Sequence, residues 1–207
     1  VSSRKLTVAE VGLSYNTNID NHFLNTYINY QKGLSSLNAL KDEQNLDKEF
    51  PKAQFDKFLY GISYVKPFEL AIQRLMFSSI FSGQYSLDPL YGSEQYSIGS
   101  LYTVRGFNQK TISGDRGYSL KNDLSLMKSH QLNNGVLTGK YYMGLDYGKV
   151  DNKYGAELVG ELSSVSIGST FNFQNVMLDF LVTQPISQPR FLEKKEADFF
   201  FTTSFTF

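Results

Sequence analysis

Hydrophobic and polar residues alternate along most of the chain in segments of about ten residues. In the clearest segment, 136–148, the odd positions are mostly apolar or aromatic and the even positions mostly polar or small. Successive side chains of a β-strand point to opposite faces, so this segment predicts a strand with one apolar and one polar face. The apolar set is Leu137, Gly139, Tyr141, Met143, Leu145 and Tyr147; the polar set is Thr138, Lys140, Tyr142, Gly144, Asp146 and Gly148.

The same pattern predicts nine strands, whose connections alternate between short and long. The strands are expected at 5–16, 22–32, 54–64, 69–84, 116–128, 136–148, 157–172, 175–184 and 197–207. Short connections are expected at 17–21, 65–68, 129–135 and 173–174, and longer ones at 33–53, 85–115, 149–156 and 185–196. Short turns on one side and long loops on the other are typical of outer-membrane barrels.

The alternation and the loop lengths favour an all-β fold, a transmembrane antiparallel β-barrel. The long loops would then lie outside the cell and the short turns in the periplasm. A soluble β-sandwich or lipocalin-like barrel is the alternative, because it also has alternating strands. Such proteins rarely need loops as long as 33–53 and 85–115.

Composition removes several other classes of protein. Of 207 residues, 20 are Lys or Arg and 20 are Asp or Glu, so the chain lacks the basic excess of a nucleic-acid binder. It has no Cys, which excludes disulfides, thiolate metal sites and cysteine nucleophiles. His22 is expected at a strand start and His130 in a short turn, and neither has the spacing of a catalytic triad or metal site. We therefore expect no enzyme activity, metal or cofactor.

The two ends of the chain bear on its place in a larger barrel. Phe205 and Phe207 close an alternating aromatic segment, and this ending resembles the terminal β-signal that the barrel-assembly machinery reads in outer-membrane proteins. The start shows no signal peptide. Single-chain bacterial barrels have even strand counts, so nine strands suggest that N-terminal strands precede this segment.

The longest connection contains two motifs that carry a family resemblance. Val104-Arg105-Gly106-Phe107 is followed by Gly114-Asp115-Arg116-Gly117-Tyr118 and then by KNDL at 121–124. This arrangement resembles the two-partner secretion transporters of the hemolysin-activator type (TpsB), in which the last four residues read close to RNEL. The first motif alone is shared with the barrel-assembly insertases of the same superfamily.

A third motif lies on the second strand after the loop, where Gly144, Asp146 and Gly148 form a G-x-D-x-G pattern. The resemblance implies that the loop folds back into the barrel and that Arg105 meets Asp146 on its wall. Alternation independently places Asp146 on the polar, lumen-facing side. A guanidinium on a carboxylate would give the long loop a directional anchor, and the two glycines would leave room for its backbone.

The resemblance covers nearly the whole chain, and it implies a function. It implies the last nine strands of a sixteen-stranded barrel in the bacterial outer membrane, preceded by periplasmic POTRA domains. That barrel would secrete a large TpsA-like exoprotein through its pore, with lipid around it. An insertase of the same superfamily is the alternative, and a passive porin would not need the motif loop.

Overall fold

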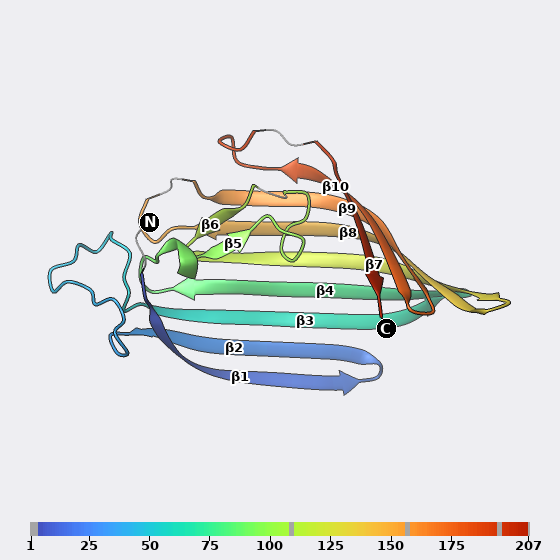
Figure 1. Ribbon diagram of the computed structural model, residues 1–207, viewed down its shortest axis with the longest axis horizontal. Coiled ribbons are helices and arrows are strands. Elements are labelled where there is room, and N and C mark those ends of the chain that lie inside the picture. Colours follow the sequence, from blue (N-terminus) through green and yellow to red (C-terminus); the bar gives the residue numbers. More distant parts are fainter. Residues whose placement is uncertain (1–3, 108–109, 156–157, 194–195, 207) are drawn as a thin grey trace.

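The computed structural model describes residues 4–107, 110–155, 158–193 and 196–206 and contains one large curved sheet (Figure 1). Nine strands form it, each antiparallel to its neighbour, in the order β1-β2-β3-β4-β7-β8-β9-β10-β11. The prediction of nine antiparallel strands is confirmed. Their bounds are β1 Thr7–Ile19, β2 His22–Leu34, β3 Asp56–Leu70, β4 Gln73–Ser86, β7 Arg116–Leu132, β8 Gly135–Asp151, β9 Gly160–Phe173, β10 Val176–Ser187 and β11 Asp198–Phe205.

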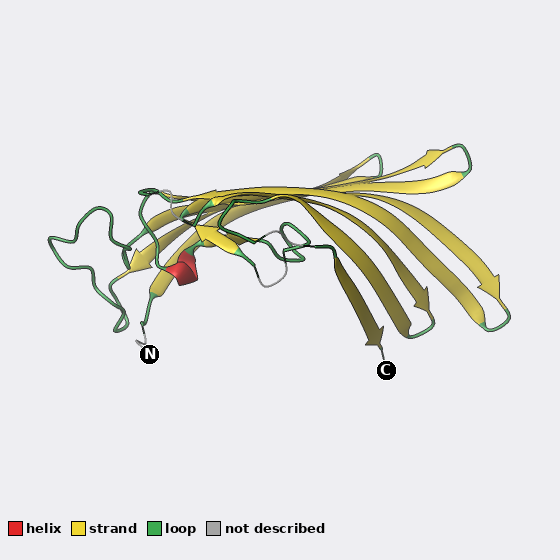
Figure 2. Ribbon diagram, turned by 90° about the horizontal axis from the view of Figure 1, so that it is seen from above, coloured by secondary structure: helices red, strands yellow, loops and turns green. Residues whose placement is uncertain are grey.

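Three short elements inside the longest connection were not predicted. They are a 3-10 helix at Gly92–Glu94 and two paired strands, β5 (Tyr96–Ile98) and β6 (Ile112–Gly114). Figure 2 shows the described parts of this connection, residues 87–107 and 110–115, lying on the inner side of the curved sheet. None of the helical residues in the described ranges forms a helix that is long and apolar enough to cross a membrane.

Three of the four turns on the short-loop side are tighter than predicted. Residues 65–68 were expected to form a turn, but β3 continues to Leu70 and Pro67 pairs with Met76. Lys66 and Pro67 interrupt the apolar alternation, whereas the hydrogen-bonded ladder extends past them. For the same reason His130 lies in β7 and not in a turn. Each of these turns has two residues: Asp20-Asn21, Ala71-Ile72, Asn133-Asn134 and Gln174-Asn175.

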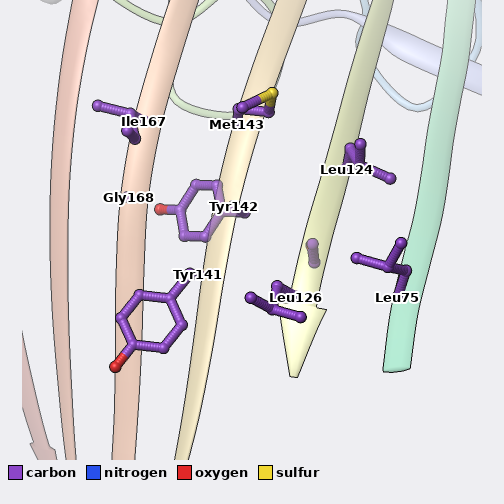
Figure 3. Close-up of a pocket in the computed structure, with 9 residues that line it drawn as sticks. Leu75, Leu124, Leu126, Tyr141, Tyr142, Met143, Ile167 and Gly168 are labelled. Atoms are coloured by element: carbon purple, nitrogen blue, oxygen red, sulfur yellow. The ribbon is translucent and has the colours of Figure 1, made fainter. Parts of the chain in front are cut away.

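The two faces of the sheet follow the predicted alternation. On β8, Tyr141, Met143 and Leu145 are exposed on the outer face, while Asp146 on the opposite face is 1% exposed. The outer face also carries a shallow apolar depression of about 320 Å³ (Figure 3). Leu124, Leu126, Tyr141, Met143 and Ile167 contribute to its lining. An apolar outer surface with a polar inner one is the arrangement that a lipid-embedded barrel wall requires.

A small hydrophobic core lies between the inner face and the long connection. Ile98, Val104 and Phe107 come from the connection, and all three are at most 1% exposed. They form a cluster with Ile112, Val150 and Leu162. Apolar packing of this kind holds the connection against β8 and β9.

Candidate functional site

Arg105 and Asp146 form a forked contact on the inner wall. Arg105 Nε donates to Asp146 Oδ2 and Nη2 donates to Oδ1, each at 2.7 Å. The Arg105 backbone N–H also donates to Oδ2 at 3.0 Å. Both side chains are almost fully buried, 3% and 0% exposed. Two parallel charge-assisted hydrogen bonds fix the position and the angle of the guanidinium.

Asp123 is a second carboxylate on the same guanidinium, and it was not among the predicted site residues. Its Oδ1 accepts from Arg105 Nη2 at 2.7 Å. Asp123 lies on β7 opposite Gly144 of β8, so it shares the inner face with Asp146. The signal was present in the sequence, because Asp123 is the acidic residue of KNDL and has the alternation phase of the inner wall.

Arg105 remains charged in this surrounding. Burial by itself would lower the pKa of the guanidinium, but the hydrogen bonds and charges of Asp146 and Asp123 raise it above its ordinary value. The guanidinium therefore keeps its proton, and loss of that proton does not break the contact.

Glycines on the wall and in the loop make the close approach possible. A Cβ at Gly144 would collide with the Arg105 guanidinium, and one at Gly148 would lie 2.8 Å from Val104 Cγ2. Gly106 has a φ of +85°, a conformation that L side chains rarely adopt, and it faces Thr183 of β10. The expected clearance at Gly144 and Gly148 is thus present.

Asp115 organises the base of the connection. One of its carboxylate oxygens accepts from the Leu90 N–H at 2.8 Å and from Gln95 at 3.2 Å, and the other accepts from the Lys153 N–H at 3.0 Å. The side chain is 3% exposed. Gly114 lies beside it, where a Cβ would approach the Asp151 backbone at 2.7 Å. Asp115 therefore links residues 90–95 of the connection to Lys153, just after β8, which is a structural role.

Further contacts make this base rigid. Lys57 of β3 reaches Glu94 at 3.0 Å, with side chains 5% and 19% exposed. Gln84 donates to the Glu94 and Asp115 carbonyls, at 2.9 and 3.2 Å. The connection thus has a base, residues 88–98 and 112–116, and a tip, residues 99–107, which carries Arg105.

The remaining residues of the second motif lie apart from Arg105. Arg116 Nε donates to the Ser86 carbonyl at 3.0 Å, and its guanidinium lies 4.4 Å from the centre of the Tyr85 ring. Tyr118 lies between Phe81 and Tyr147 on the outer face, 6.0 Å from each ring. Gly117 is buried, and a Cβ there would approach Val150 at 2.7 Å. Val104, Arg105, Gly106 and Phe107 therefore form the site with Gly144, Asp146 and Gly148, while the second motif supports it from the base.

The predicted C-terminal signal is described only in part. Phe205 is 60% exposed and pairs with Val176 of β10, at the last position of β11. Phe207 lies outside the described residues.

The sequence matches a known family and several curated relatives. Residues 1–171 match the model of the haemolysin secretion/activation protein ShlB/FhaC/HecB. The chain is 30% identical over 186 residues to the hemolysin transporter protein ShlB of Serratia marcescens, covering 89% of this chain and 32% of that protein. It is 32% identical over 198 residues to the outer membrane transporter CdiB of Dickeya dadantii, covering 93% and 34%.

Solved structures agree with these matches. CdiB from Escherichia coli superimposes with a TM-score of 0.89 at 26% identity, covering 99% of this chain and 37% of that one. CdiB from Acinetobacter baumannii shares the fold, with a TM-score of 0.75 at 21% identity. The chain spans about a third of the length of the relatives it matches.

Proposed function

This chain belongs to the haemolysin secretion/activation protein family ShlB/FhaC/HecB, and from that premise we propose that it forms the translocating pore wall of a two-partner secretion transporter. The pore would pass a large partner exoprotein across the outer membrane. The relatives are named hemolysin transporter and outer membrane transporter, which supports a role in transport. The chain would contribute the part of the barrel in which the tip carrying Arg105 is anchored to the inner wall.

The fork between Arg105 and Asp146 is the observation that carries this proposal. Holding a long connection against a wall costs conformational entropy, and a buried, two-bonded ion pair offsets that cost. The anchor places the tip across the inner face, where an exported chain would pass. A wall of polar residues would let an extended polypeptide slide without binding it tightly.

Secretion by single and double variants tests the anchor. Removing one member of a buried ion pair costs about 3–5 kcal/mol, and less where water enters. We expect Arg105→Ala and Asp146→Ala each to reduce secretion several-fold at near-normal membrane levels, because the strand ladder holds the barrel. The double variant should be hardly worse than either single variant, since the shared contact is lost only once.

Lys110→Ala is the matched control. Lys110 is another cation of the same connection, but its ion pair with Glu193 is exposed, with side chains 31% and 91% accessible. We expect it to secrete normally. Normal secretion by Arg105→Ala would remove the proposed role of the tip, and fully additive defects would show that Arg105 and Asp146 act separately.

A further inference from the structure

Lys121 is a second cation beside the anchor, and it binds the tip through a backbone carbonyl. Its ammonium donates to the Leu101 carbonyl oxygen at 3.0 Å. Within the described parts of the chain, Lys121 makes no ion pair with a carboxylate within 4.0 Å. Both neighbouring carboxylates, Asp146 and Asp123, are occupied by Arg105.

The register places Lys121 within reach of both carboxylates. Lys121 is directly opposite Asp146 in the β7–β8 pair, and Asp123 is two positions further along β7 on the same face. Cross-strand partners have Cβ atoms about 4.5–5.5 Å apart, and positions i and i+2 on one strand are about 6.6 Å apart. The flexible four-carbon stem of lysine can span either separation.

The charges balance only while the tip is in place. Arg105 and Lys121 supply two positive charges, and Asp123 and Asp146 supply two negative charges. When the tip leaves the wall, Arg105 leaves with it, and two neighbouring carboxylates remain on the wall. Lys121 loses the Leu101 carbonyl in the same movement. Its ammonium is therefore free to bind the two carboxylates at the moment when they lose Arg105.

We propose that Lys121 is a positioning residue that exchanges partners, from the Leu101 carbonyl when the tip is docked to Asp146 and Asp123 when it is released. This inference rests on the anchoring role proposed for Arg105. In the docked state the ammonium of Lys121 is repelled by the nearby guanidinium. Its hydrogen bond goes to the partly exposed Leu101 carbonyl, to which a water molecule could donate in its place. In the released state Lys121 offsets one of the two negative charges left on the wall. Lys121 therefore favours release, although it contacts the tip.

The proposal predicts an effect on release of the tip that is opposite to the effect expected if Lys121 were a simple anchor. Removing an anchor would free the tip, whereas removing Lys121 should hold the tip in place more firmly. Lys121→Met keeps the stem length and removes the charge, and Lys121→Arg keeps the charge. Lys140→Met is the control, because Lys140 is a β8 lysine of the inner-face phase whose ammonium lies over the Tyr142 ring and whose cross-strand partner on β7 is Met127 and not a carboxylate.

The test measures how often the tip leaves the wall. This chain has no cysteine, so Val104→Cys is a single reporter within it, buried when docked; the full-length transporter is used in nanodiscs with any cysteine outside this chain replaced by serine. A maleimide reacts with this reporter cysteine only after the tip has left the wall. The labelling rate is divided by the rate measured for the same variant in the unfolded state. Phe107→Cys, also buried in the docked state, is a second reporter that guards against local disturbance at residue 104.

We expect Lys121→Met to slow labelling several-fold at both reporters, Lys121→Arg to restore the parental rate, and Lys140→Met to leave it unchanged. Faster or unchanged labelling in Lys121→Met would overturn the exchange of partners. Arg105→Ala on the Phe107→Cys reporter separates this failure from a failure of the proposed function. Arg105→Ala should accelerate labelling; if it does not, the anchor itself is refuted.

Discussion

Arg105 contacts two carboxylates, and they hold it unequally. Asp146 accepts three hydrogen bonds from Arg105, one of them from the backbone, whereas Asp123 accepts one. Asp146 is also the more deeply buried of the two acids. The position of the tip therefore depends mainly on Asp146, with Asp123 as a supporting contact.

Amide substitutions at the two acids should reflect this difference. Asp146→Asn loses the charge in a site where both oxygens are used, while Asp123→Asn can still accept one hydrogen bond through its amide oxygen. We expect Asp146→Asn to reduce secretion several-fold and Asp123→Asn by less than half that factor. Secreted exoprotein, compared at matched membrane levels, measures both, and equal defects would contradict the ranking.

A methyl group at Gly144 should displace the tip without breaking the barrel. The added Cβ would collide with the Arg105 guanidinium and lie 2.5 Å from oxygens of Asp123 and Ser166. Gly139→Ala on the same strand is the control, because its nearest neighbours would lie at 3.4 Å, an ordinary contact. Faster labelling of the buried Phe107→Cys reporter is expected for Gly144→Ala and not for Gly139→Ala.

At the scale of elements, alternation predicted the long strands because each spans several repeats of the two-residue period. It could not predict β5 and β6, since three residues contain no measurable period. The turn expected at 65–68 was wrong because the β3–β4 ladder continues through Pro67 to Leu70. The contact of Arg105 with Asp146 could be expected from the motifs. KNDL and the alternation also marked Asp123, but its contact with Arg105 depends on how the connection folds, as does the Lys57–Glu94 pair, which no motif marked.

Charged substitutions on β8 test the assignment of its two faces. An Arg on the lipid face near the membrane centre costs about 2–4 kcal/mol. Met143 is 60% exposed on the outer face, and Thr138 has the opposite phase. We expect Met143→Arg to lower the amount of heat-modifiable folded barrel in outer-membrane fractions, and Thr138→Arg to leave it near normal. Equal tolerance would refute the assignment.

At the scale of the whole molecule, all two-residue turns lie at one end of the sheet and all long connections at the other. Because outer-membrane barrels have short periplasmic turns and long outer loops, this asymmetry predicts an orientation with the long connections outside. The match to outer-membrane transporters agrees with that location.

Two cysteines should report the orientation. Glu43 lies in the connection between β2 and β3, and Ile72 lies in the turn between β3 and β4, where it is 91% exposed. On intact cells an impermeant maleimide should label Glu43→Cys and spare Ile72→Cys, and lysed cells should label both. The reverse pattern would invert the topology.

Every strand of the large sheet pairs only with its neighbours along the chain, and this sets the order in which the wall can assemble. Hairpins closed by two residues form with little delay, but β7 reaches β4 only across residues 87–115. The entropy cost of closing a flexible loop rises with its length, by about 0.6 kcal/mol per doubling. We therefore expect the pairing of β4 with β7 to be the slow step of assembly. A partly assembled sheet in which these two strands are not yet paired should accumulate before it.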